Sequence, residues 1–173
     1  MNLAYVMTRQ RGATDRLLSG FAADCTARGL ALAGVVQTNT DCTDARLCDM
    51  DVRVLPHGPE FRISQSLGPG ARGCRLDPAA LEEAVVAVEH GLDRRPDLLI
   101  VNKFGKHEAD GRGFREVIAR CLAADVPVLT GVNARNLDAF LDFSAGMARA
   151  LDPDPPALRA WVAALPARGD DAA

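Results

Sequence analysis

The chain has 173 residues, of which 48% are hydrophobic and 25% are charged, and its formal net charge at pH 7 is −3. This length is typical of one domain, so we expect a single domain over residues 1–173, with residues 151–173 as a C-terminal helix and a frayed tail. The small negative charge argues against a nucleic-acid partner, and no apolar run is long enough for insertion into a membrane.

The amino-terminal segment lacks the layout of a signal peptide, and the five cysteines are an odd number. We therefore expect a cytoplasmic protein without a disulfide framework. Cys25 and Cys121 fall in helical patterns and are expected to pack as small apolar side chains. Cys42, Cys48 and Cys74 fall in predicted loops, where a role as ligands or reactive thiols stays open.

The first third of the chain alternates between strand and helix patterns. Residues 3–7 predict a strand, residues 16–28 a helix and residues 30–37 a second strand. This strand–loop–helix–strand unit is typical of a parallel α/β sheet with a right-handed crossover.

The loop of residues 8–15 lies where a phosphate-binding loop would lie, after the first strand and at the opening of the first helix. In the pattern G-x-x-x-x-G-K-[ST], Gly12 and Thr14 match. Met7 replaces the first glycine, and Ala13 replaces the lysine. Backbone N–H groups at a helix start still hold anions, but the missing lysine argues against efficient hydrolysis.

Two interpretations of this loop stay open. In the first, Arg9, Arg11 or Arg16 supplies the missing positive charge. In the second, the segment is an ordinary strand-to-helix turn in which Thr14 or Asp15 caps the helix.

The middle of the chain predicts a small β-hairpin, from residues 52–55 and 61–65. The glycine-rich residues 66–75 are a surface loop, a mobile flap or a second loop that contacts an anion, and these alternatives stay open. Asp77 followed by Pro78 indicates the start of a helix that runs to about residue 90.

A second candidate loop follows the apolar residues 98–101, which predict a strand buried on both faces. The run ends at Asn102, and the only two lysines of the chain, Lys103 and Lys106, come directly after it. Ligands of open parallel sheets bind at the carboxyl ends of the strands. Because lysine is a compact charge often used against phosphate, we expect both lysines to contact an anion; a solvated loop is the alternative.

Two arginines, Arg112 and Arg115, lie near the start of a helix predicted over residues 114–123. Cations are disfavoured at that end of the helix dipole unless an anion is present. This position supports an anion site, although Glu108 and Asp110 could equally pair with the arginines.

The last third predicts a strand over residues 126–132, a helix over residues 137–150 and a final helix over residues 157–165. Met147 belongs to the apolar face of the middle helix. Trp161 of the final helix is expected to pack on the body of the protein.

Several segments in combination resemble one family. They are residues 73–77 (GCRLD), 99–106 (LIVNKFGK), Glu108 and 111–115 (GRGFR), with Gln37 and residues 62–65 (RISQ) in the same pattern. The chain resembles the bacterial family called "domain of unknown function" 2478 over nearly its whole length. The resemblance implies a fold similar to P-loop nucleoside triphosphatases of the small thermophilic type. That fold is α/β, a three-layer sandwich with a mostly parallel central sheet, here with the β-hairpin as a small insertion.

The family is often encoded beside molybdenum transport components, which makes molybdate a candidate ligand. In active triphosphatases the second motif is an apolar strand that ends in acidic residues, which help to hold magnesium and activate water. Here that strand ends in Asn102, a poorer magnesium anchor, and Glu108 is the nearest carboxylate downstream.

Three hypotheses follow. The first is a degenerate P-loop-like protein that binds an anion, either a nucleotide phosphate or an oxyanion such as molybdate. The second is a slow Mg²⁺-dependent nucleoside triphosphatase, in which Glu108 positions water and Thr14 contacts the metal. The third is a non-catalytic partner protein, or a thiol or metal module that uses the loop cysteines. A homo-oligomer or a molybdenum-transport-related partner stays open.

The predicted site residues can now be collected. Glu108 and Asn102 are the candidates for catalysis, and no metal-ligand set is predicted. The candidates for binding the ligand, with or without Mg²⁺, are Arg9, Gln10, Arg11, Gly12, Ala13, Thr14, Asp15, Gln37, Lys103, Phe104, Gly105, Lys106 and Arg112.

Overall fold

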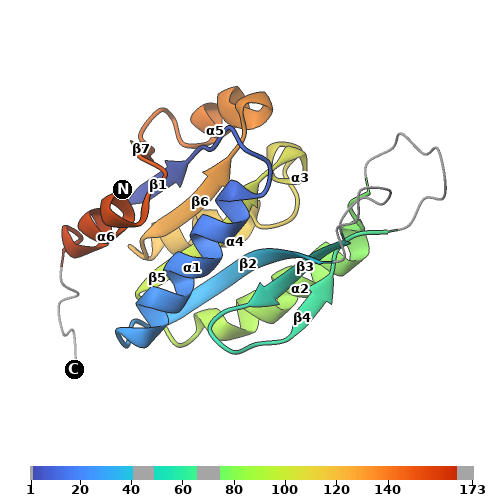
Figure 1. Ribbon diagram of the computed structural model, residues 1–173, viewed down its shortest axis with the longest axis horizontal. Helices are drawn as coiled ribbons and strands as arrows, with labels where there is room; N and C mark the ends of the chain where they lie inside the picture. Colours follow the sequence, from blue (N-terminus) through green and yellow to red (C-terminus); the bar gives the residue numbers. More distant parts are fainter. Residues whose placement is uncertain (1, 41–48, 66–74, 167–173) are drawn as a thin grey trace.

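A computed structural model describes residues 2–40, 49–65 and 75–166 of the chain. Within these residues the centre is a seven-stranded sheet in the order β4-β3-β2-β5-β6-β1-β7 (Figure 1). The strands are β1 (Leu3–Val6), β2 (Leu32–Thr40), β3 (Asp49–Val54), β4 (Glu60–Arg62), β5 (Leu98–Phe104), β6 (Val128–Val132) and β7 (Arg149–Leu151). Strands β2, β5, β6, β1 and β7 pair in parallel, whereas β3 and β4 form an antiparallel hairpin on β2, as predicted.

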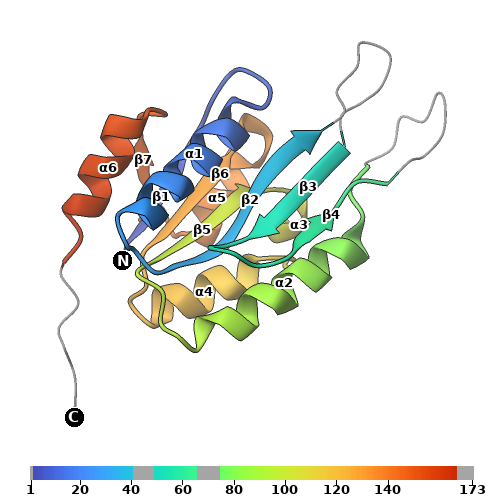
Figure 2. The same ribbon diagram turned by 60° about the horizontal axis from the view of Figure 1, so that its bottom comes forward.

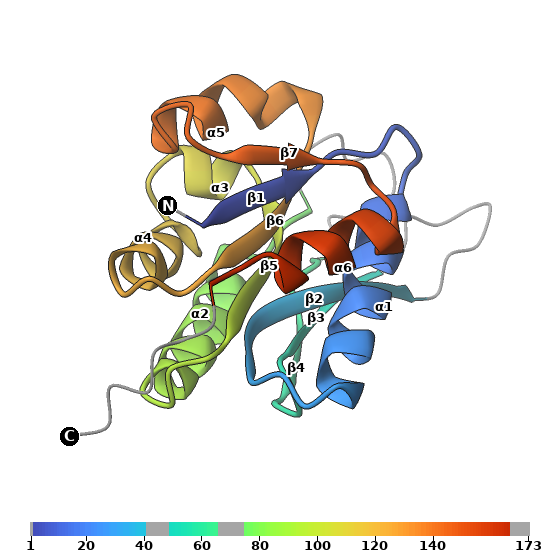
Figure 3. The same cartoon turned by 90° about the vertical axis from the view of Figure 1, so that its left-hand side faces the viewer.

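Helices cover both faces of the sheet. On one face lie α1 (Ala13–Ala27) and α6 (Pro155–Ala163), and on the other lie α2 (Pro78–Leu92) and α4 (Arg115–Ala123) (Figures 2 and 3). The shorter helical elements are α3 (Lys106–Ala109), η1 (Ala134–Asn136) and α5 (Leu137–Phe143). The predicted three-layer α/β sandwich is therefore confirmed.

Strand β5 lies in the middle of the core because both of its faces are covered. Leu98 and Ile100 belong to the apolar cluster under α1 and α6, whereas Leu99 and Val101 belong to the cluster under α2 and α4. Because neither face of such a strand meets solvent, its residues do not alternate between apolar and polar, which explains the continuous apolar run. Trp161 of α6 is buried in the same apolar cluster as Leu98 and Ile100, so it packs on the body of the protein as predicted.

The prediction that β5 ends at Asn102 was wrong. The strand continues to Phe104, and both side chains are buried, with exposed fractions of 2% for Asn102 and 0% for Phe104. The ring of Phe104 lies 5.1 Å from that of Phe140 and 5.3 Å from that of Phe143. A polar residue after an apolar run is typical of a strand end, but here the strand continues past Asn102 inside the protein.

The prediction of one helix over residues 137–150 was also wrong. Helix α5 ends at Phe143, and the chain turns at Ala145 and Gly146, which both have positive φ. It then forms β7, an edge strand parallel to β1. Met147, predicted on the apolar face, is 60% exposed.

The starts of α1 and α2 follow different rules. Asp77 caps α2 as predicted, because its side chain accepts from the N–H groups of Ala79 and Ala80. Helix α1 begins at Ala13, three residues earlier than predicted. Its N-cap is Gly12, at φ 73°, without a side-chain cap, so neither Thr14 nor Asp15 is the cap.

Candidate functional site

The loop after β1 and the carboxyl ends of β5 and β6 meet around a small cavity, so Lys103 lies in β5 and not in the loop in which it was predicted. The volume of the cavity is about 280 Å³, and we call it the loop cavity. It is lined by Thr8, Arg9, Gln10, Arg11, Gly12, Thr14, Asp15, Lys103, Gly131, Val132 and Asn133. The structure thus brings the predicted phosphate-binding loop and Lys103 to one place.

The loop between β1 and α1 is held partly by its own hydrogen bonds. The hydroxyls of Thr8 and Thr14 lie 2.7 Å apart, and the N–H of Ala13 donates to the carbonyl of Gln10 at 3.2 Å. Gly12 takes the left-handed backbone conformation that the turn requires. Ala13 itself lines no cavity, so its contribution is to the turn.

Gly131 of β6 lets the start of α1 approach the sheet closely. A Cβ added there would lie 2.5 Å from the methyl carbon of Thr14 and 2.6 Å from the carbonyl oxygen of Asn102. No side chain fits in that space. The absent side chain therefore fixes how near the loop lies to β5 and β6.

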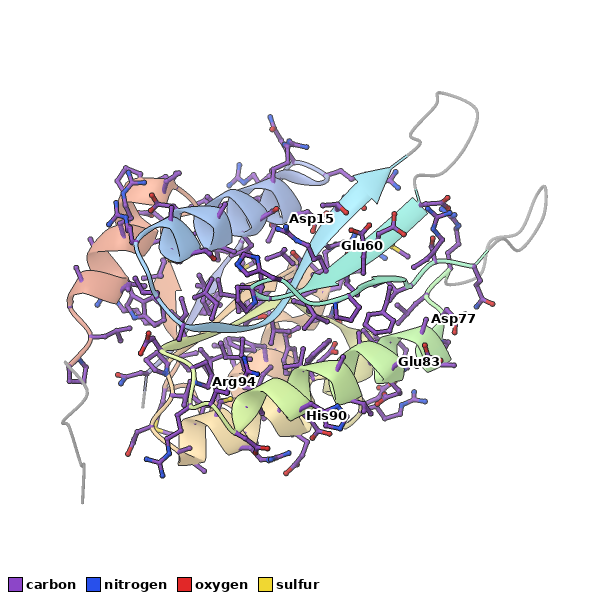
Figure 4. All side chains as sticks on the ribbon, turned by 90° about the horizontal axis from the view of Figure 1, so that it is seen from below. Asp15, Glu60, Asp77, Glu83, His90 and Arg94 are labelled. Atoms are coloured by element: carbon purple, nitrogen blue, oxygen red, sulfur yellow. The ribbon has the colours of Figure 1, made fainter. Side chains whose placement is uncertain are left out.

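Behind the loop cavity a closed ring of hydrogen bonds joins α1, β2 and β5. The carboxylate of Asp15 accepts from the amide groups of Asn102 at 2.8 Å and of Asn39 at 2.7 Å. Gln37 donates its side-chain amide to Asn39 at 2.8 Å and its backbone N–H to the amide oxygen of Asn102 at 2.9 Å. Asp15 lies at the amino end of α1, against the sheet (Figure 4).

Lys103 supplies the charge that the buried carboxylate of Asp15 needs. Its Nζ lies 3.2 Å from Oδ1 of Asp15, whose exposed fraction is 5%. Burial by itself raises the pKa of Asp15, but Lys103 and the hydrogen bonds from Asn102 and Asn39 outweigh it and lower the pKa below its ordinary value. Asp15 is therefore ionised at neutral pH, and Lys103, whose side chain is 45% exposed, belongs both to this ion pair and to the cavity wall.

The position of Glu108 indicates a structural role. It is 4% exposed, its Oε2 accepts from the N–H of Gly105 at 2.8 Å, and its Oε1 accepts from the N–H of Phe114 at 3.2 Å. Burial raises its pKa, while these hydrogen bonds act in the opposite direction. Gly113 leaves room for this carboxylate, because a Cβ there would overlap Oε1 of Glu108. Glu108 thus holds the loop between β5 and α4 closed.

The other predicted cations of this loop are exposed and share one carboxylate. Nζ of Lys106 lies 2.8 Å from Asp110, and the guanidinium of Arg112 lies 3.6 Å from the same side chain. Arg115 instead donates to the carbonyl of Glu108 and lies 4.5 Å above the ring of Phe143. The interpretation that the two arginines pair with acidic side chains therefore holds for Arg112 but not for Arg115, and Lys106 forms an ion pair with Asp110 that was not predicted.

A second hollow, which we call the large cleft, opens beside the loop cavity. Its volume is about 1350 Å³. Polar and charged residues at its lining include Arg11, Asp15, Arg16, Gln37, Asn39, Gln65, Arg75, Asn102, Lys103, Lys106, His107, Glu108, Asp110 and Arg112, with Gly12 and Gly105 among them. Apolar residues at its lining include Val35, Met50, Val52, Ile63, Leu76, Leu81, Val101 and Phe114.

Several predicted residues thus gather here, and others do not. Phe104 packs in the core and lines neither hollow. Asn39, Gly131 and Asn133 were missed. Asn39 could have been found from the sequence, because it is a second polar residue at the carboxyl end of a core strand, two positions after Gln37. Cys42, Cys48 and Cys74 lie outside the described residues, while Cys25 and Cys121 are buried as predicted.

Two features are absent from the part of the chain that the structure describes. No group of three or more His, Cys, Asp or Glu side chains there could hold a metal ion. None of the helices described is both long and apolar enough to cross a membrane.

The described residues form a three-layer α/β sandwich around a mostly parallel sheet. The chain matches the model of the family described as "Protein of unknown function (DUF2478)" over residues 3–161, and it belongs to that family.

Two solved structures have a similar fold. THEP1 from the hyperthermophile Aquifex aeolicus is 15% identical with a TM-score of 0.63, covering 94% of this chain and 95% of that one. A human cancer-related nucleoside triphosphatase is 14% identical with a TM-score of 0.62, covering 88% of each chain. At these identities the likeness concerns the fold alone.

A third relative is similar in sequence. The molybdenum import ATP-binding protein ModC 2 of Bradyrhizobium diazoefficiens is 36% identical over 159 residues, or 92% of this chain. The chain spans 18% of the length of that protein.

Proposed function

We propose that this protein binds a nucleoside phosphate at the loop of residues 8–15 and hydrolyses it slowly or not at all. The observation that carries the proposal is the position of this loop, which follows β1, opens α1 and lines the loop cavity opposite Lys103. Phosphate groups bind where backbone N–H groups of a helix start converge with a few cations. Arg9, Arg11 and Lys103 are the cations of the loop cavity.

We expect slow turnover because the loop lacks its lysine and the candidate catalytic side chains already make hydrogen bonds inside the protein. Ala13 brings no charge to the outer phosphates, and both oxygens of Glu108 accept backbone hydrogen bonds. The amide of Asn102 is engaged with Asp15 and Gln37. Asp15, the carboxylate that lines the loop cavity, is engaged with Asn39, Asn102 and Lys103. A water molecule would therefore lack an unengaged carboxylate to position it, although a Mg²⁺-dependent hydrolase stays the alternative.

An oxyanion such as molybdate is the second candidate ligand. Such an oxyanion is bound by the same groups as a phosphate, namely converging N–H donors and a few cations. The relative named as a molybdenum import protein favours it, and a molybdenum-transport-related partner would belong to the same function. A cytoplasmic location fits either ligand.

A thermal-shift panel tests these ligands: ATP, ADP, GTP, molybdate, tungstate, sulfate and phosphate, each with and without Mg²⁺. A ligand that binds only the folded protein raises the midpoint as its concentration rises. We expect a nucleotide to give the largest shift and phosphate release from ATP to stay near background. A shift with molybdate or tungstate alone would favour the second candidate, and rapid phosphate release with Mg²⁺ would favour the hydrolase.

The variant Arg9→Ala tests the place of binding. Arg9 is exposed and lines the loop cavity but not the large cleft. Loss of one charge-assisted contact should weaken nucleotide binding about tenfold while the melting midpoint of the free protein stays unchanged. Arg94→Ala, in the exposed turn that follows α2 (Figure 4), is the matched control. Equal binding by Arg9→Ala and the wild type would contradict the proposed site.

A further inference from the structure

The large cleft is several times larger than the loop cavity beside it. Its volume of about 1350 Å³ exceeds that of ordinary small-molecule pockets, which hold roughly 300–1,000 Å³. Arg11, Gly12, Asp15 and Lys103 line both hollows. The ion pair of Asp15 with Lys103 therefore stands at the boundary between two compartments, of which the loop cavity is the smaller.

Charges at the large cleft are unevenly matched. Leaving out the shared residues, its cations are Arg16, Arg75, Lys106 and Arg112, and its carboxylates are Glu108 and Asp110. Arg75 pairs with Asp49, and Lys106 and Arg112 share Asp110. Arg16, exposed on the first turn of α1, has no ion-pair partner among the residues that the structure describes. The cleft thus keeps an excess of positive charge in a chain whose net charge is −3.

One wall of the large cleft is apolar. Met50 and Leu76 are partly exposed there, and Pro78 at the start of α2 is exposed. Behind them lie the aliphatic side chains of β2, β3 and β5. A bare oxyanion gains nothing from such a wall, whereas an apolar ring or chain is stabilised by burial against it.

We infer that the large cleft is a second binding site, for a small organic anion with an apolar body. The anionic group lies toward Arg16, Lys106 and Arg112, and the body lies on the wall formed with Leu76. This site goes beyond the proposed function, because it would bind its ligand whether or not a nucleoside phosphate occupies the loop cavity.

The probe for this site is anilinonaphthalene sulfonate, an anionic aromatic dye whose fluorescence rises in apolar surroundings. Titrated into the full chain, it should bind with one site per chain and remain bound in the presence of excess ATP. Its neutral counterpart, phenylnaphthylamine, should bind more weakly because it lacks the charge that Arg16 attracts.

Arg16→Ala and Arg9→Ala form a matched pair of exposed arginines on the two sides of the boundary. We expect Arg16→Ala to weaken dye binding about tenfold, and Arg9→Ala to weaken ATP binding while leaving dye binding unchanged. ATP binding should stay unchanged in Leu76→Ala, because Leu76 lines the large cleft but not the loop cavity. Leu76→Ala should weaken dye binding without a change of charge, with folding of each variant checked by its melting curve.

Three results would overturn the second site: no saturable dye binding by the folded protein, displacement of the dye by ATP, or equal weakening by Arg16→Ala and Arg9→Ala. Failure of the proposed function has a different signature, because ATP then gives no shift while the dye still responds to Arg16→Ala.

Discussion

At the scale of single residues, buried polar groups at the carboxyl edge are already paired inside the protein. Asp15, Asn102 and Glu108 are each at most 5% exposed and each makes at least two hydrogen bonds. A buried polar group that loses its partner costs more free energy than its hydrogen bond contributed. Changes at these residues should therefore affect stability before they affect any ligand.

The variant Glu108→Gln tests this view. Glutamine keeps one acceptor oxygen but places an NH₂ group against the N–H of Gly105 or Phe114. We expect a loss of about 1–3 kcal/mol in the free energy of unfolding, measured by urea denaturation. Glu83→Gln, on the exposed face of α2 (Figure 4), should change it little. A stable Glu108→Gln variant that lost Mg²⁺-dependent phosphate release would instead make Glu108 catalytic.

The pH dependence of stability tests Asp15. Its folded pKa is lowered, so its ionised form stabilises the protein above the unfolded pKa, and this stabilisation is lost as pH falls through the folded pKa. Asp15→Asn should be less stable than the wild type at pH 7, because the new NH₂ group meets the donors of Asn39 or Asn102. Below about pH 4 the difference should shrink, since Asp15 of the wild type takes up a proton first in the unfolded chain and, at lower pH, in the folded protein. A difference that is constant from pH 7 to the acid limit would contradict the ion pair.

At the scale of elements, the position of α1 against β5 and β6 depends on one glycine. In Gly131→Ala the added carbon would meet the backbone oxygen of Asn102, which cannot move without shifting β5. We expect the midpoint of thermal unfolding to fall, with a loss of about 1–3 kcal/mol.

Gly20→Ala is the control for that variant. Gly20 lies in α1 with open space around its Cα, so alanine should stabilise the helix by about 0.5–1 kcal/mol. If Gly131→Ala were as stable as the wild type, the close approach of α1 would not constrain the sheet.

Elements with a local signal could be predicted from the sequence. Asp77 and Pro78 marked the start of α2, and the apolar run marked β5. Strand β7 could not, because three residues at the edge of the sheet pair only with β1, far away in the chain. The end of β5 was missed for a similar reason, since the partners that allow Asn102 to be buried lie 65 and 87 positions away.

At the scale of the whole molecule, the alternating strand and helix patterns predicted a parallel sheet, and the family resemblance implied the three layers. The sequence also predicted that the loop after β1 and Lys103 lie together at the carboxyl edge, but not that the end of β6 joins them. It could not predict that Lys103 pairs with Asp15 or that Glu108 closes its own loop, because these pairings depend on the spatial approach of separate elements. The division of the edge into two compartments depends on the same pairings.

The ring around Asp15 has a consequence for motion. Strands β2 and β5 pair through their backbones as far as Val35 and Val101. Beyond that point the backbone N–H of Gln37 donates its hydrogen bond to the side-chain oxygen of Asn102 and not to a backbone carbonyl of β5. This one side chain joins β2, β5 and α1, so the edge of the sheet opens only when the whole ring breaks. The amide proton of Gln37 should therefore exchange with solvent slowly, at a rate that reports the opening of the ring.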